Sequence, residues 1–115
     1  MAVTVAEEAT GTLSSTGSDT EDTVRDQGST TGVFQLVIDL TNLAGVDATV
    51  IIREKIQVLS AGSDKVVNVA TYYGPQVATN TCVELPVRHN LYGYLVSLED
   101  SGSTKDFPWS LREIG

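Results

Sequence analysis

The chain has 115 residues, 41% of them hydrophobic, which is enough for the core of one domain and too few for two ordinary ones. Its net charge of -8 weighs against nucleic-acid and anionic-membrane binding, because both need a basic surface. Its single cysteine, Cys82, excludes an internal disulfide, and no apolar run approaches the roughly 20 residues of a membrane span.

The first segment, residues 1–31, is rich in Thr, Ser, Gly and acidic residues. Six acidic residues against one arginine give this segment a charge of -5, more than half of the total. Its first ten residues lack the basic and apolar regions of a signal peptide, so we expect synthesis in a reducing cytosol. We predict an extended acidic arm with one or two weak strands that orders on a neighbouring molecule. The arm residues predicted to contact a partner are Val3, Val5, Leu13 and Val24.

A strong strand pattern begins at Gly32, so we predict a β-sandwich domain over residues 32–115. Residues 32–41 alternate, and their wholly apolar face predicts a core strand formed by Phe34, Leu36, Ile38 and Leu40. Residues 48–60 form a second predicted strand, whose apolar face is interrupted by Glu54. A helix is the alternative for residues 53–59, but the β-branched residues of the run weigh against it.

Four further strands complete the pattern. They are predicted at residues 65–74, about 81–87, 91–100 and 106–114. Pro86 marks the edge or the end of its strand, and Pro108 predicts that the closing strand is an edge or leaves that position unpaired. On the closing strand, Trp109 shares a face with Phe107 and Leu111, and we expect it to anchor the core.

The number of strands and the length of the turns predict an antiparallel sandwich. Five of these strands are clear, and with the weaker ones, those of the arm included, the total is six to eight. Hairpin-length turns favour antiparallel pairing. The spacing fits an Ig-like and a jelly-roll topology equally well.

Residues suited to catalysis are sparse. His89 lies in a predicted polar turn, and Cys82 lies in a predicted strand, where we expect a buried small side chain. The sequence has no nucleophile-elbow, phosphate-loop or dinucleotide motif. Two acidic groups do not match a calcium loop and are interpreted as solvated acids and turn caps: Asp19, Glu21 and Asp22, and Asp39, Asn42 and Asp47. We therefore predict no enzyme activity, no cofactor and no metal site.

Two tyrosines add to the predicted partner contacts. Tyr92 and Tyr94 are two residues apart and would share one face of a strand. Cross-strand packing and a contact patch for another protein or a glycan both fit this spacing.

Several segments together resemble a known class. They are TGTLSSTGSDTEDTV (10–24), FQLVIDLTNLAGVD (34–47), VIIREKIQVLSAG (50–62), VATYYGPQV (69–77) and GYLVSLEDSGSTKDFPWSLREI (93–114). In this order they resemble small virion structural proteins of tailed bacteriophages. The resemblance implies a protein that decorates or cements the capsid surface, through strand or arm contacts with the major capsid protein and with copies of itself. A tail or neck module of the virion, with a glycan as its ligand, is the alternative.

Overall fold

The computed structural model describes residues 4–115, and the regular secondary structure of this part is almost entirely β-strand. The strands are β1 (Val5–Ser14), β2 (Thr20–Gly28), β3 (Gly32–Asp39), β4 (Thr49–Gln57), β5 (Asp64–Tyr73), β6 (Cys82–Glu84), β7 (Arg88–Asn90), β8 (Tyr94–Asp100) and β9 (Asp106–Ile114). Two 3-10 turns, η1 (Thr41–Leu43) and η2 (Gly74–Gln76), lie in the connections.

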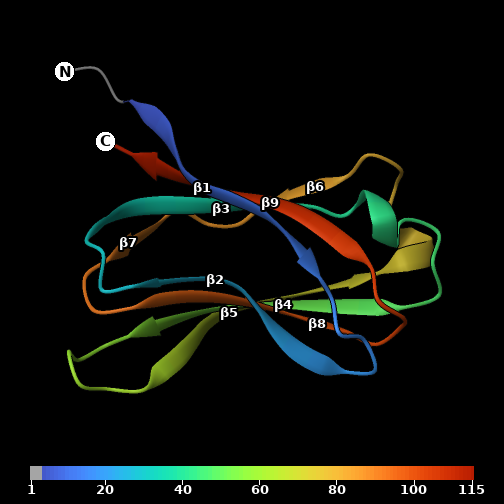
Figure 1. Cartoon of the computed structure of the whole chain (residues 1–115), viewed down its shortest axis with the longest axis horizontal. Helices are drawn as coiled ribbons and strands as arrows, with labels where there is room; N and C mark the ends of the chain where they lie inside the picture. The colour runs from blue at the N-terminus through green and yellow to red at the C-terminus, as the bar shows by residue number, and fades with distance from the viewer. Residues whose placement is uncertain (1–3) are drawn as a thin grey trace.

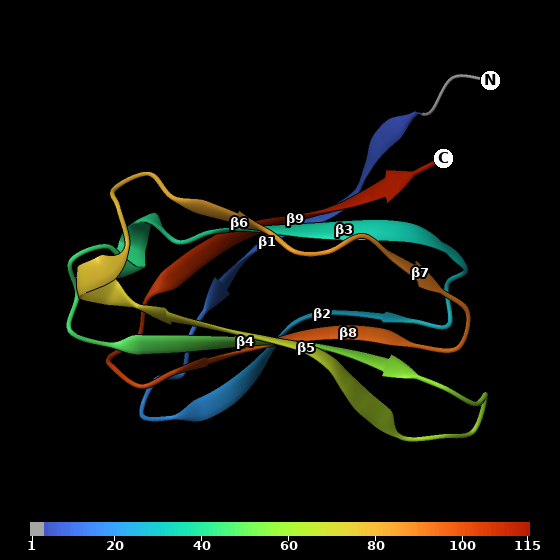
Figure 2. The same cartoon turned by 180° about the vertical axis from the view of Figure 1, so that it is seen from behind.

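The strands form two antiparallel sheets that pack face to face (Figures 1 and 2). The first sheet has the order β1-β9-β3-β6, with β7 also paired to β3, and the second has the order β2-β8-β4-β5. When β6 and β7 are counted as one interrupted strand, this order is that of a jelly roll. The predicted all-β antiparallel sandwich is confirmed, and the topology decides between the two alternatives that the sequence left open.

The predicted core faces are confirmed. Phe34, Leu36, Ile38 and Leu40 are fully buried, and so are Val50 and Ile52 of β4 in the opposite sheet. Residues 53–57 continue β4 as a strand, so the helical alternative for this run is wrong. Burial of each such side chain stabilises the fold by about 1.5–3 kcal/mol, which makes the alternating strands the main source of stability.

The front segment is part of the sandwich, so the predicted division between an arm at 1–31 and a domain at 32–115 is wrong for the described residues of the arm. β1 pairs with β9 from Val5 to Ser14, and β2 pairs with β8 from Thr20 to Gly28. Both are outer strands with one solvent-facing side, where Thr and acidic residues are suitable. Because these strands need little apolar surface, their sequence resembles that of a free arm.

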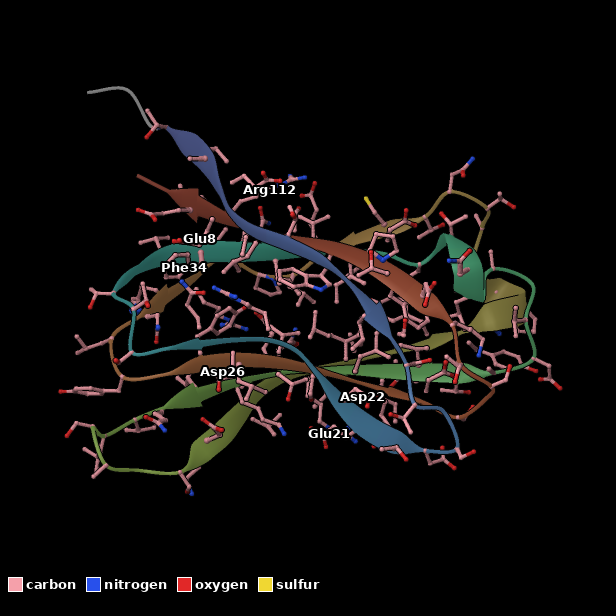
Figure 3. All side chains as sticks on the ribbon, in the orientation of Figure 1. Glu8, Glu21, Asp22, Asp26, Phe34 and Arg112 are labelled. Carbon is pink, nitrogen blue, oxygen red and sulfur yellow. The ribbon has the colours of Figure 1, made fainter. Side chains whose placement is uncertain are left out.

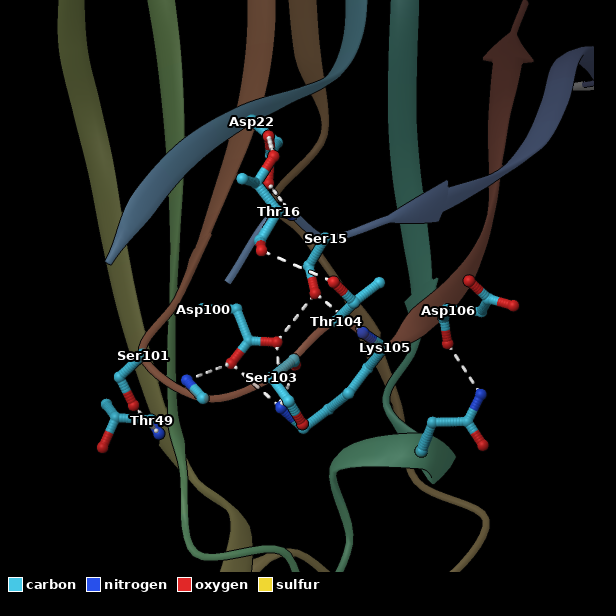
Figure 4. A network of polar contacts seen from close by, with 12 residues as sticks. Ser15, Thr16, Asp22, Thr49, Asp100, Ser101, Ser103, Thr104, Lys105 and Asp106 are labelled. Atoms are coloured by element: carbon cyan, nitrogen blue, oxygen red, sulfur yellow. Dashed lines mark hydrogen bonds and ion pairs between the residues drawn. The ribbon is translucent and has the colours of Figure 1, made fainter. Parts of the chain in front are cut away.

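A polar network around a buried ion pair joins this front segment to the β8–β9 connection (Figure 4). Asp100 is fully buried, and its carboxylate lies 3.0 Å from Lys105 Nζ. Ser15 Oγ and the Gly102 amide also donate hydrogen bonds to Asp100, at 2.8 and 2.9 Å. The network therefore joins the β1–β2 connection to the β8–β9 connection.

The closing strand β9 lies inside its sheet, between β1 and β3, so the edge alternative for Pro108 is wrong. The pairing with β3 ends at Trp109, opposite Ile38, and Pro108 faces only Thr12 of β1. This agrees with the other alternative, an unpaired position. Trp109 is half-buried and packs against the core.

Candidate partner-binding surface

Large apolar side chains are exposed together at one end of the sandwich, which we call the apolar end. It comprises Val58, Leu59, Val67, Val87, Leu91 and Tyr92, which are exposed, and the half-buried Ile56. The β4–β5 and β7–β8 connections project side by side at this end, on the left of Figure 1 and the right of Figure 2. Val58, Leu59 and Leu91 are 64%, 69% and 59% exposed, although residues of these types are usually buried. A cluster of this kind is typical of a contact surface.

Two surface pockets lie at the apolar end. One, of about 210 Å³, is lined by Ile56, Val67, Val87, Arg88 and His89. The other, of about 270 Å³, is lined by Ile56, Gln57, Val58, His89, Asn90, Leu91, Tyr92 and Gly93. Both are smaller than the roughly 300–1,000 Å³ of typical small-molecule sites. Their size suits single side chains of a partner better than an enclosed substrate.

Arg88, which lines the first pocket, forms an ion pair with a buried carboxylate. Glu54 is fully buried and accepts hydrogen bonds from Tyr94 Oη at 2.7 Å, Asn68 Nδ2 at 3.1 Å and Arg88 Nη2 at 3.3 Å. Since Arg88 belongs to β7 and Glu54 to β4, the ion pair joins the two sheets. Burial, together with the hydrogen bond to Glu54, raises the pKa of Tyr94 far above its ordinary value, so its hydroxyl stays a donor. The Arg88 Nε atom is buried and has no partner among the described residues.

The sequence did not predict this cluster. Glu54 was only an interruption of an apolar face, because its partners lie 14, 34 and 40 residues away. The available signal was the position of Glu54, a charged residue among the inward-facing positions of a strand. A charged residue that is buried there needs a partner.

The predicted contact residues differ in their exposure to solvent. Val24 and Tyr94 are buried, at 7% and 1% exposure, so their prediction as contacts is wrong: Val24 faces the core, and the Tyr94 hydroxyl binds Glu54. Leu13 is half-buried against the core, and Val5 is exposed on β1. Val3 lies outside the described residues.

Tyr92 is 38% exposed and lines a pocket at the apolar end. It does not share a strand face with Tyr94, because β8 begins only at Tyr94. Of the predicted contacts, Tyr92 is therefore the one that the structure places among other exposed apolar side chains.

The residues considered for chemistry are dispersed. Cys82 is exposed, which contradicts the expected buried position. Over residues 4–115, no group of three or more His, Cys, Asp or Glu side chains could hold a metal ion. Asp39 caps the turn that follows β3, as predicted, and the hydrogen bonds from Thr41 hold its pKa below the ordinary value. No helix in the described part of the chain is long and apolar enough to cross a membrane.

The outer side of the second sheet is polar along β2 and the neighbouring parts of β8 and β4. Glu21 accepts hydrogen bonds from Lys55 and Ser97, which lower the pKa of its carboxyl group, and Arg53 lies 3.1 Å from Glu99. Acidic side chains also follow the front strands, with Glu8 on β1 and Glu21, Asp22 and Asp26 on β2 (Figure 3). The apolar end thus contrasts with the charged surface of these strands.

Comparison with known proteins adds information on the fold. No protein-family model matches the chain, and no curated protein matches its sequence significantly. The crystal structure of PirA is similar, with a TM-score of 0.60 over 92% of this chain and 93% of that chain. Since the sequences are 11% identical, this likeness supports the sandwich fold alone.

Proposed function

We propose that this chain is a non-enzymatic structural protein of a phage particle that decorates or cements the capsid surface. The observation that carries the proposal is the apolar end, where exposed Val, Leu and Tyr side chains gather on a chain of net charge -8. Its docking partner is the major capsid protein, and its site of action is the virion surface. The resemblance of the sequence to small phage structural proteins supports this choice of partner.

The apolar end takes the place of the arm in this mechanism. Residues 5–14 and 20–28 pair within their own domain, so an arm that orders only on the particle is not part of the proposal. The two side-chain-sized pockets accept apolar residues of the capsid protein. Many copies on one particle then add modest contacts together, so no single interface needs to be large.

Co-sedimentation with purified capsids that lack the chain tests this proposal. We expect a variant with Leu59→Ser and Leu91→Ser to bind at least about tenfold more weakly, because it loses two apolar contacts. Val46→Ser is the matched control, since Val46 is 37% exposed but lies in the η1–β4 connection, away from the apolar end. Equal binding of the double variant and the control contradicts the proposed surface. Absence of the chain from purified virions, by mass spectrometry, contradicts the virion role itself.

A tail or neck module that binds a glycan is the second candidate. One observation favours it: the exposed ring of Tyr92 borders a pocket that also contains Gln57 and His89, and so combines an apolar face with polar groups. A glycan array separates the candidates. Saturable binding that is lost in Tyr92→Ala favours the glycan module, and no binding to any glycan removes it.

A further inference from the structure

We propose that two copies of this chain pair through β5, antiparallel and with a two-fold axis at Thr71, so that the second sheet continues from one copy into the other. The proposal rests on the outer edge of the second sheet and is independent of the proposed capsid role. It assigns a surface to self-association that is separate from the pockets of the apolar end.

The β5 edge has the character of a pairing surface. β5 is the last strand of the order β2-β8-β4-β5, so one of its sides has no strand partner within residues 4–115. Val66, Val69 and Tyr73 are 51%, 54% and 42% exposed. No charged residue occurs from Val66 to Tyr73. A long, apolar, uncharged edge of this kind readily adds another strand.

The other sheet edges carry the features that normally prevent pairing. β2 presents Glu21, Asp22, Arg25 and Asp26 and has two register irregularities. β1 carries Glu7 and Glu8, and β6 has three residues and is followed closely by Pro86. Charges and short length each disfavour edge-to-edge addition, and β5 has neither from Asn68 to Tyr73, so it is the edge left open.

A second copy is the partner that the β5 sequence fits. The register of β4 and β5 places Val69, Thr71 and Tyr73 on the outer face, opposite Arg53, Ile51 and Thr49. A two-fold axis at Thr71 sets Thr71 against itself and Val69 against Tyr73 of the other copy. Threonine pairs and aromatic pairs with β-branched residues are among the favourable cross-strand combinations. On the inner face, the same register sets Ala70 against Tyr72, a small side chain against a large one.

Charge and length define the strength of this pairing. Two chains of net charge -8 repel, and the uncharged β5 edge lets them approach without bringing carboxylates together. The register irregularity at Lys55 leaves Val67 without a partner on β4, so the regular part of the edge is Asn68–Tyr73, roughly 20 Å long. An interface of this length is at the small end of specific contacts, so we expect a dissociation constant on the order of micromolar.

Cross-linking of the full chain tests the register. In a Cys82→Ala background, Thr71→Cys places two thiols on the two-fold axis, where facing Cα atoms of an antiparallel pair lie about 4.5–5.5 Å apart, within disulfide range. Copper-phenanthroline and dissolved oxygen accept the two electrons and two protons that the thiols lose. Val69→Cys is the matched control, because its two copies would lie four residues apart along the strands, about 13 Å. We expect a cross-linked dimer from Thr71→Cys and little from Val69→Cys.

Analytical ultracentrifugation measures the association without any cysteine. We expect wild type to dimerise reversibly in the micromolar range, Thr71→Lys to dimerise at least tenfold more weakly, and Thr23→Lys on the β2 edge to behave as wild type. A chain that stays monomeric at millimolar concentration overturns the proposal. So does cross-linking that is equal at positions 69 and 71. Protection of β5 amides from hydrogen exchange only on capsids also overturns it, because the strand partner would then belong to the capsid protein.

Discussion

Removal of Arg88 tests whether the buried Glu54 is held by its partner on the opposite sheet. Breaking a buried ion pair by removing one member typically costs about 3–5 kcal/mol. Three features reduce this value for Arg88→Met: the Arg88 side chain is 29% exposed, Glu54 keeps its bonds to Tyr94 and Asn68, and the unpaired Arg88 Nε disappears. We therefore expect a loss of about 2 kcal/mol, or a fall in Tm of roughly 8 °C.

Urea denaturation of Arg88→Met, Glu54→Gln and the double variant completes the test. If the uncompensated charge is the cause, the double variant should recover at least half of the loss, because a glutamine amide is neutral and still reaches Tyr94 and Asn68. The coupling energy should then be about 1 kcal/mol or more. Strictly additive losses, or an Arg88→Met variant within 0.5 kcal/mol of wild type (roughly the limit for surface changes), would refute the argument.

Three further changes give distinct outcomes. Lys105→Met leaves the buried Asp100 carboxylate uncompensated and should cost about 3–4 kcal/mol in urea denaturation, with faster hydrogen exchange in the two connections that it joins. The pKa of Glu21 is lowered in the folded chain, so the ionised Glu21 side chain stabilises the fold above its ordinary pKa near 4.5. This stabilisation is lost as the pH falls through the lower folded value. Glu21→Gln should therefore cost less than about 1 kcal/mol at pH 7 and should reduce the loss of stability between pH 5 and 3. Gly74→Ala should cost at least about 3 kcal/mol by thermal denaturation, because the added Cβ would lie 1.8 Å from the Val46 carbonyl oxygen. Gly28→Ala should cost about 1 kcal/mol, because the added Cβ meets no other atom and only the φ of +57° is unfavourable for alanine.

The parts of the fold that follow from local alternation could be predicted from the sequence. From Phe34 to Leu40 every second residue is apolar, and such a pattern buries one face of an extended segment. The sequence indicates β1 and β2 only as weak strands of an arm, because an outer strand is held largely by backbone pairing, which leaves little apolar pattern in the sequence. The topology depends on which strands meet across the chain, and turn lengths alone do not determine it.

The candidate surface was less accessible to sequence reasoning for a related reason. Tyr92 and Tyr94 have the same spacing as two residues on one strand face, yet the start of β8 at Tyr94 buries one and leaves the other exposed. Leu59 and Leu91 lie 32 residues apart in the sequence and gather at one end only because the β4–β5 and β7–β8 connections project together. Exposure of an apolar residue is a property of the packed molecule, so no local pattern could indicate it.

The two proposed contacts constrain each other through the geometry of the sheet. The apolar end lies where β4 ends and β5 begins, at one end of a molecule whose longest dimension is 42 Å. A two-fold axis at Thr71 reverses the strand direction, so the apolar ends of the paired copies point in opposite directions. Such a dimer cannot place both ends in one flat site, and it would instead join two separate capsid positions. Joining two positions raises the effective affinity without any new contact, provided that their spacing matches the length of the dimer. A weak edge contact and a modest docking surface would then be sufficient for the proposed cementing role, because neither would have to hold the chain on a particle alone.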